Sequence, residues 1–269
     1  METKKERNKA LEMNIVMLGA GNVATHLSKA LQKKGFSIVQ VYSRTDASAK
    51  ALAELLNAPY TTKTDDINSE ADIYIYTLKD NALEEIIHKI NLPDAIHIHT
   101  AGSVNIDVFE GRAKHFGVIY PMQTFSKSKE VNFENIALMV EANTEETTDT
   151  LFGIAQQLSN RCYKTNSEQR KKIHLSAVFA CNFTNYMYTI AEELLNETNA
   201  PFDILQPLIA ETAEKIKYLS PAKAQTGPAV RYDTVIIEKH LKMLENRPEL
   251  QQLYKEISKL IYNKSTTKI

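Results

Sequence analysis

The fold of this chain is decided by the stretch IVMLGAGNVA at residues 15–24. It opens with four apolar residues, a short run that is typical of a buried parallel strand. Gly19 then allows a tight turn, and Gly21 lacks the side chain that would block a bound pyrophosphate. We therefore predict a dinucleotide-binding turn of the form G-x-G-x-x-A, in which the N–H groups of a helix opening at Asn22 and Val23 face the phosphates. The alternative is a plain pair of turn glycines.

Outward from this turn, the chain alternates between short apolar runs and helical patterns. Further strands are expected at residues 38–42, 73–78, 95–100, 116–120 and 136–140, and helices at residues 47–56, 81–90 and 145–158. Strand–helix–strand units of this length are typical of a parallel sheet with helices on both faces. The predicted fold class is therefore α/β, with a doubly wound and mostly parallel sheet.

The pattern changes near residue 165. Beyond it, apolar residues recur at helical spacing, and helices are expected over residues 167–197, 202–219, 232–245 and 249–262. We therefore predict a nucleotide-binding sheet domain at residues 1–165 and an all-helical domain at residues 166–269.

The composition is that of a globular protein. The chain has 269 residues, of which 43% are hydrophobic and 24% are charged, which excludes disordered and fibrous classes. Its formal net charge is −1, so there is no basic surplus for nucleic acid, and no apolar run approaches the length of a membrane span. Two cysteines, Cys162 and Cys181, cannot cross-link a chain of this size, so they indicate either a reducing compartment or a fold that does not depend on disulfides. With a charged rather than signal-like stretch at residues 1–13, we expect a cytoplasmic protein.

The end of the second expected strand indicates which dinucleotide is bound. An NAD site normally places Asp or Glu there, about 20 residues after the glycine turn, to hold the ribose 2′-hydroxyl. This chain instead has Ser43, Arg44 and Thr45, with no acid before Asp46. A guanidinium and two hydroxyls would bind a 2′-phosphate, which a carboxylate would repel. We predict NADP(H) as the cofactor; the alternative is that Arg44 is a solvated surface residue.

A later strand end is expected to face the same crevice. It carries Thr77, Leu78 and Lys79, and loops at the carboxyl ends of parallel strands hold ligands in doubly wound folds. Lys79 either reaches a phosphate or is ordinary surface charge. We count all three residues as candidate cofactor contacts.

The next strand end brings two histidines and a glycine. His97 and His99 share a face because strand periodicity is two, but no Cys, Asp or Glu stands nearby at ligand spacing, so no metal is expected. His99 and Gly102 are instead candidate cofactor contacts. The alternative for His99 is a structural histidine with satisfied hydrogen bonds.

Reduction of a C=O or C=N bond by NADPH needs a proton donor. On the helix expected from residue 167, His174 is the candidate. Asn185 lies within roughly 20° of it around a regular helix axis, and Asn182 lies about 80° away. His174 and one of these amides could reach one cavity, or they could satisfy polar groups between helices. Cys181 lies in an apolar stretch and is interpreted as a core residue.

An arginine beside a tight turn completes the set of candidates. Arg231 follows the break at residues 226–228 and could clamp a carboxylate or phosphate of the substrate. It could equally pair with Asp233 or Glu238 and fix the turn.

Four stretches carry a resemblance to a known family: HTAGS at 99–103, YPMQTF at 120–125, HLSAVFACN at 174–182 and TGPAVRYD at 226–233. The chain resembles, over nearly its whole length, the Rossmann-like NADP oxidoreductases with a C-terminal helical domain of formerly unknown function. It is similar more widely to pyrroline-5-carboxylate reductases, 6-phosphogluconate and β-hydroxyacid dehydrogenases, and deazaflavin-dependent NADP reductases. The resemblance implies a second domain of the 6-phosphogluconate dehydrogenase C-terminal-like type, which helps to form a homodimer and the substrate site.

The chain departs from these families at several positions. Family members often carry His where this chain has Tyr120, and Ser where it has Ala101. The β-hydroxyacid dehydrogenases place a catalytic Lys four residues before an Asn on the first long helix of the second domain. Here that helix offers only Lys171 and Lys172, near its start, and no K-x-x-x-N. The mechanism of those dehydrogenases therefore does not transfer.

These observations predict an NADP(H)-dependent oxidoreductase that transfers a hydride between NADPH and a small polar substrate, which is a C=O compound, a C=N compound or a deazaflavin acceptor. His174 would donate the proton, and Asn182 and Arg231 would orient the substrate. The expected partners are the substrate and a second copy of the chain, with no nucleic acid and no membrane. Two alternatives remain: a non-catalytic NADP(H)-binding sensor or regulator, and a helical-domain scaffold for a partner protein.

Overall fold

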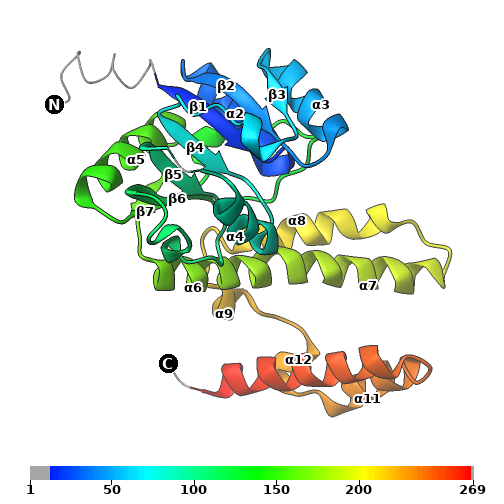
Figure 1. The fold of residues 1–269 in the computed structure, drawn as a ribbon. Coiled ribbons are helices and arrows are strands. Elements are labelled where there is room, and N and C mark those ends of the chain that lie inside the picture. Colours follow the sequence, from blue (N-terminus) through cyan, green and yellow to red (C-terminus); the bar gives the residue numbers. More distant parts are fainter. Residues whose placement is uncertain (1–12, 92, 268–269) are drawn as a thin grey trace. The chain divides into compact units, whose positions relative to one another are not determined.

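The structure, a computed structural model, describes residues 13–91 and 93–267 (Figure 1). All but the last residue of the charged N-terminal stretch lies outside the described residues. The chain divides into two compact units, one that ends at Tyr186 and one that begins at Met187. The division into functional domains at residue 165 stays a prediction.

The first unit, here called the sheet unit, is built on one eight-stranded sheet in the order β3-β2-β1-β4-β5-β6-β7-β8. Its strands are β1 (Asn14–Leu18), β2 (Ser37–Tyr42), β3 (Tyr60–Thr61), β4 (Ile73–Tyr76), β5 (Ile96–His99), β6 (His115–Pro121), β7 (Leu138–Ala142) and β8 (Cys162–Lys164). All neighbouring strands are parallel except β6 and β7, which are antiparallel. The predicted mostly parallel sheet is therefore confirmed. Strands β3 and β8 are too short to show a periodic pattern, and the sequence did not indicate them.

Alternate residues of β1 point into two separate cores. Ile15 and Met17 belong to one apolar cluster and Val16 and Leu18 to the other. The first cluster is completed by α2 (Asn22–Lys33), α3 (Asp46–Leu56) and α5 (Glu145–Leu158), and the second by α4 (Asp80–Lys89). Helices thus cover both faces, as a doubly wound sheet requires.

The strand order reverses between β1 and β4, because β2 lies on one side of β1 and β4 on the other. In open parallel sheets the crevice at such a reversal, outside the carboxyl ends of the strands, is where ligands bind. The glycine turn after β1 lies at this place.

Short helical turns and one long helical run complete the sheet unit. The short turns are 3₁₀ helices at Thr64–Asp66, Ile106–Phe109 and Phe133–Asn135. The long run consists of α6 (Ser167–Ala177), a π-helical turn (Val178–Phe183) and α7 (Thr184–Asn196), which crosses into the second unit. The helix expected over residues 167–197 is therefore present, with a π-helical interruption that the sequence did not indicate.

The second unit, here called the helical unit, contains the rest of α7 and the helices that follow. These are a 3₁₀ turn (Phe202–Leu205), α8 (Gln206–Lys215), α9 (Pro221–Ala224), α10 (Pro228–Arg231), α11 (Thr234–Met243) and α12 (Pro248–Thr266). In the part of the chain that the structure describes, no helix is long and apolar enough to cross a membrane.

Candidate active site

The glycine turn is required by a close approach between two strand ends. Gly19 has a φ of +120°, and a Cβ atom on it would lie 2.5 Å from Oγ1 and 2.6 Å from the carbonyl oxygen of Thr77. Its N–H donates to the Tyr42 carbonyl at 2.7 Å, and the Thr77 N–H donates to the Leu18 carbonyl at 2.8 Å. Only glycine fits this position, because any side chain would displace the end of β4.

Gly21 is not required by packing within the protein; it leaves open space beside the start of α2. A Cβ atom there would meet nothing within 4 Å, and the residue has an ordinary φ of −84° as the N-cap of α2. No side chain caps this end of α2, and its first turn contains no acidic residue. The first-turn N–H groups, those of Asn22 and Val23 among them, lie at a helix N-terminus, which favours an anion.

The loop between β6 and β7 contacts the start of α2 and holds it in place. Asn22 Nδ2 donates to the Phe125 carbonyl at 2.8 Å, and Lys127 Nζ donates to the Ala20 carbonyl at 3.2 Å. The ring of His26 stacks on that of Phe125, with centroids 5.4 Å apart. These contacts fix the glycine turn against a segment about 100 residues away in the sequence.

The loop after β2 ends at Thr45, which is the N-cap of α3. Arg44 is exposed and lines a cavity of about 440 Å³ that also contains Lys63, Thr64 and Lys89. Within residues 13–91 and 93–267, Arg44 forms no ion pair. Its guanidinium is therefore available to a ligand.

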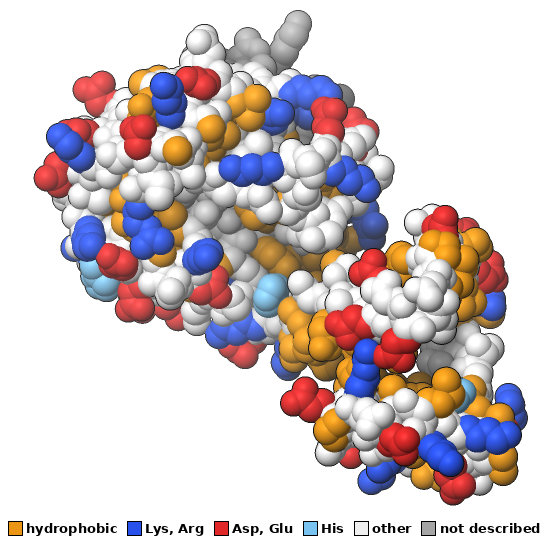
Figure 2. Space-filling view, turned by 90° about the vertical axis from the view of Figure 1, so that its right-hand side faces the viewer, with side chains coloured by type: hydrophobic (Ala, Val, Ile, Leu, Met, Phe, Trp, Pro, Cys, Tyr) orange, Lys and Arg blue, Asp and Glu red, His pale blue; other side chains and the backbone are white. Residues whose placement is uncertain are grey.

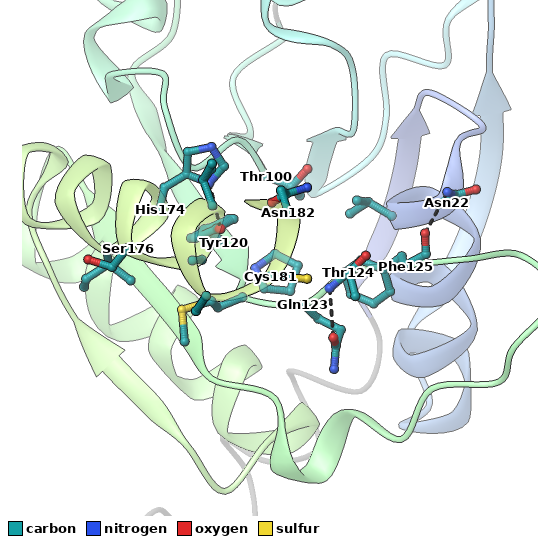
Figure 3. Close-up of a pocket in the computed structure, with 17 residues that line it drawn as sticks. Asn22, Thr100, Tyr120, Gln123, Thr124, Phe125, His174, Ser176, Cys181 and Asn182 are labelled. Atoms are coloured by element: carbon teal, nitrogen blue, oxygen red, sulfur yellow. Dashed lines mark hydrogen bonds between the residues drawn. The ribbon is translucent and has the colours of Figure 1, made fainter. Parts of the chain in front are cut away.

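A second cavity of about 720 Å³ begins at the first turn of α2 and extends to α6 and the π-helical turn (Figure 3). Its lining residues all belong to the sheet unit. The polar side chains among them are Asn22, Thr100, Tyr120, Gln123, Thr124, His174, Ser176 and Asn182. The cavity thus joins the predicted cofactor turn to the predicted proton donor.

His174 is placed by two contacts. Its Nδ1 atom lies 3.0 Å from the Tyr120 hydroxyl. A Cβ atom on Gly102 would lie 2.7 Å from Cγ and Nδ1 of His174, so the ring packs directly on the glycine backbone. Gly102 therefore shapes the cavity through His174, which the sequence did not indicate.

The π-helical turn decides which amide reaches the cavity. A π turn has i→i+5 hydrogen bonds and rotates the chain less per residue than an α-helix. Asn182, about 80° from His174 in a regular helix, is thereby turned back toward it and lines the cavity. The same change carries Asn185 away, and it is not among the lining residues. Thr184 Oγ1 donates to the Phe179 carbonyl at 3.1 Å, five residues back, and so satisfies one oxygen of the widened turn.

Cys181 is half-buried and lines the cavity, so its interpretation as a core residue is wrong. The apolar stretch around it borders the cavity instead of the sheet.

The first turn of α6 takes part in a buried polar network that no sequence pattern indicated. Arg170 is fully buried, pairs with Glu141 of β7 and donates to the Val104 carbonyl. Ser167 Oγ donates to Asn105 Oδ1 at 2.9 Å, and the Ser167 N–H donates to Glu141 Oε1 at 2.9 Å. The network ties α6 to strand β7 and the loop after β5, and so fixes the helix that carries His174.

The histidines of β5 lie inside the fold. His97 is fully buried, with Nε2 3.0 Å from the Pro93 carbonyl and Nδ1 3.0 Å from the Tyr76 hydroxyl. His99 is also fully buried, stacks on Phe109, and accepts from the Ala101 N–H at 3.1 Å. Burial, with a smaller effect from the charge of Arg170, lowers the pKa of His99 to about 3, so its ring is neutral.

The ring of His99 is fully buried and is not among the side chains that line the 720 Å³ cavity, so its role as a cofactor contact stays a prediction. Strand periodicity identified the shared face of His97 and His99 but not that this face is the second core. Across residues 13–91 and 93–267 no cluster of side chains suits a metal ion.

The other candidates lie on elements that do not line this cavity. Thr77 and Leu78 are half-buried just after β4, and Lys79 is the exposed N-cap of α4. Arg231 is exposed at the end of α10 in the helical unit.

Comparison with known proteins agrees with this arrangement. The family described as "NADP oxidoreductase coenzyme F420-dependent" matches residues 14–103, and a domain of unknown function, DUF2520, matches residues 136–261. The crystal structure of a "putative NADP oxidoreductase" from Bacteroides fragilis is 50% identical, covers 94% of this chain and 99% of its own, and superposes with a TM-score of 0.90.

More distant structures share the fold. A 1-pyrroline-5-carboxylate reductase from Streptococcus pyogenes is 13% identical and covers 94% of this chain and 99% of its own, with a TM-score of 0.62. An imine reductase from Myxococcus stipitatus in complex with NADP⁺ is 14% identical and covers 93% of this chain and 92% of its own, also with a TM-score of 0.62.

One curated relative matches a short segment. A glucose-fructose oxidoreductase domain-containing protein from Xenopus laevis is 40% identical over 62 residues, which is 22% of this chain and 16% of that protein.

Proposed function

The chain belongs to the Rossmann-like NADP oxidoreductase family with a C-terminal DUF2520 domain, and we propose that it transfers a hydride between NADPH and a small polar substrate. The substrate would be a C=O compound, a C=N compound or a deazaflavin acceptor. One observation carries the proposal: the 720 Å³ cavity runs from the first turn of α2 to His174. A pyridine nucleotide at that turn and a proton donor at His174 would face the same space.

The residues present fit a dinucleotide. Gly21 leaves open space where a side chain would stand, and the uncapped start of α2 favours the pyrophosphate. Thr77 lies against Gly19, and we expect Thr77 and Leu78, just after β4, and Lys79, the N-cap of α4, to contact the dinucleotide. His99 would act here only indirectly, since its ring is buried.

NADP(H) is favoured over NAD(H) by the loop after β2. Ser43, Arg44 and Thr45 supply a guanidinium and two hydroxyls, and Arg44 shares its cavity with Lys63 and Lys89. Lys89 pairs with Glu85, and Asp65 also lines this cavity, so the choice rests on Arg44, which has no ion-pair partner among the described residues, and on the lack of an acid at the position that holds a 2′-hydroxyl. The NADP⁺ bound to the imine reductase supports the choice by analogy.

When bound, NADPH supplies the hydride. His174 would deliver the proton to the oxygen or nitrogen of the reduced group, and Asn182, on the same wall of the cavity, would hold that group by its amide. Arg231, in the helical unit, would bind an anionic group of the substrate.

We place the protein in the cytoplasm as a homodimer. Both described cysteines are free, which suits a reducing compartment. Large apolar side chains are exposed along the helical run, at Leu175, Phe179, Phe183 and Tyr186, and over the helical unit (Figure 2). Exposed apolar surface of this extent supports cover by a second copy.

The cofactor assignment is tested by titrating NADPH and NADH into the wild type and Arg44→Ala by calorimetry. Loss of a charge-assisted contact to phosphate predicts roughly 10- to 100-fold weaker NADPH binding, with NADH binding unchanged. Arg161→Ala, an exposed arginine before β8, is the control. Equal weakening of both nucleotides would reject the 2′-phosphate contact.

The reaction is tested by following nicotinamide absorbance with a panel of small aldehydes, ketones, cyclic imines and a deazaflavin. His174→Ala should keep NADPH binding and lose turnover by roughly 100-fold or more. Unchanged turnover in His174→Ala would remove the proton-donor role. NADPH binding without turnover of any compound by the wild type would favour a sensor.

A further inference from the structure

Tyr120 is the nearest polar neighbour of the proposed proton donor. It is the penultimate residue of β6, and its hydroxyl lies 3.0 Å from His174 Nδ1. The two rings meet edge to face, with centroids 5.7 Å apart and planes inclined at 78°. Both side chains line the 720 Å³ cavity, as Figure 3 shows. A strand of the sheet and helix α6 are thus joined at the wall of the proposed reaction space.

The contact leaves one nitrogen of His174 for a substrate. Nδ1 faces the Tyr120 hydroxyl, and the Gly102 backbone packs against the Cγ and Nδ1 atoms. Among the residues that the structure describes, Nε2 has no hydrogen-bond partner. Nε2 is therefore the atom from which a proton can be delivered.

A phenol suits this place better than a charged partner. Burial raises the pKa of Tyr120, so the hydroxyl keeps its proton at neutral pH. A hydroxyl can accept from Nδ1–H of the imidazolium before the proton is delivered and of the neutral ring afterwards, and it can donate to Nδ1 when the neutral ring carries its proton on Nε2. The same partner therefore holds the ring in each of these states.

We propose that Tyr120 is a positioning residue for His174, whose hydroxyl holds the imidazole so that Nε2 carries the proton delivered to the substrate. This rests on the proposed function. In the step, the proton leaves Nε2 of the imidazolium for the oxygen or nitrogen of the reduced substrate. The electron pair of that N–H bond stays on Nε2, and the remaining Nδ1–H donates to Tyr120 Oη.

The first test needs no cofactor or substrate. The ¹⁵N resonance of Nδ1 and the ring mobility of His174 are measured by NMR in the cofactor-free protein, for the wild type, Tyr120→Phe and Tyr120→His. Tyr120→Phe keeps the ring but removes the hydroxyl, so Nδ1 should shift to the position of a nitrogen without a donor, and the ring should become more mobile. Tyr120→His, which again offers an N–H, should restore both in part.

Tyr163→Phe, which removes an exposed hydroxyl on β8, is the matched control and should change neither measurement. An unchanged Nδ1 resonance and unchanged ring mobility in Tyr120→Phe would overturn the proposal. Backbone amide spectra of each variant show that the fold is intact.

The second test uses the panel compound that the wild type reduces fastest. Tyr120→Phe should lower kcat roughly 10- to 100-fold with KM unchanged, and it should have no further effect in a His174→Ala background. Independent, multiplying effects would also overturn the proposal. If the wild type fails to bind NADPH, the proposed function fails, while the resonance test still decides whether Tyr120 holds the ring.

Discussion

The sheet unit buries most of its large apolar side chains, whereas the helical unit exposes many of its own. Both core clusters lie in the sheet unit, where strands β1, β4 and β7 are almost wholly buried. Among its described residues the helical unit buries little beyond Ala229, Ile237, Leu244 and Ser258. It exposes Leu208, Tyr218, Met243 and Leu260, each to more than 60%.

This difference in burial implies that the two units gain their stability from different surfaces. Burial of apolar surface contributes roughly 25 cal/mol per Å², so the sheet unit is stabilised from within. The helical unit retains large apolar area in contact with water and gains most from an additional surface. We therefore expect changes inside the sheet unit to alter the free energy of unfolding, and changes on the helical unit to alter association.

The largest expected effect is inside the sheet unit. Arg170→Met removes a fully buried guanidinium and leaves the mostly buried carboxylate of Glu141 without its partner. The free energy of unfolding, measured by urea denaturation, should fall by about 3–5 kcal/mol. The control, Lys171→Met, breaks an exposed pair with Glu168 and should cost less than about 0.5 kcal/mol. Similar losses in the two variants would show that the buried network does not hold α6.

A smaller effect is expected from acid. Burial lowers the pKa of His99 from 6.5 to about 3, so the unfolded chain binds this proton more readily than the folded one. Stability from His99 is therefore present above about pH 6.5 and is lost progressively toward about pH 3. Between pH 8 and about pH 5, the free energy of unfolding of the wild type should therefore fall by roughly 2 kcal/mol more than that of His99→Gln.

Denaturation of both proteins across this pH range measures the difference. His88→Gln, an exposed histidine on α4, should keep the acid sensitivity of the wild type. Parallel pH profiles for the wild type and His99→Gln would contradict the assignment of a neutral buried ring.

The smallest effect on folding is expected on the helical unit. Leu208→Glu and Leu260→Glu place charges on exposed sites of α8 and α12, so unfolding of the isolated chain should change by no more than about 0.5 kcal/mol. Light scattering should show the mass falling from two chains to one. Leu55→Glu, on the exposed side of α3, is the control and should leave the mass unchanged. A wild type with the mass of one chain would overturn the homodimer.

Sequence reasoning worked where the physical signal is local. The stretch at residues 15–24 predicted its strand, turn and helix, because apolar periodicity and the two glycines are read from adjacent residues. The mostly parallel sheet followed from the alternation of such units. Strand β3, with two residues, offers no period to detect.

Contacts between distant residues could not be read this way. Tyr120 and His174 are 54 residues apart, and their hydrogen bond depends on how β6 and α6 pack. The position of Tyr120 at the carboxyl end of a parallel strand was the available signal. His99 is a second example. Strand periodicity predicts which face of the sheet His99 lies on, but only its stacking on Phe109 shows that this face is buried.

The π-helical turn at Val178–Phe183 also bears on how this site can change over generations of sequence. Such a turn holds one residue more than an α-helical turn in the same run, so a single insertion into a regular helix would create it and a single deletion would remove it. Because the extra residue adds about as much rotation as the wider turn takes away, the α-helical stretches on either side keep their faces. One codon could therefore add or remove this turn while α6, with His174, and α7 keep the faces that they present, so that only the positions inside the turn are exchanged.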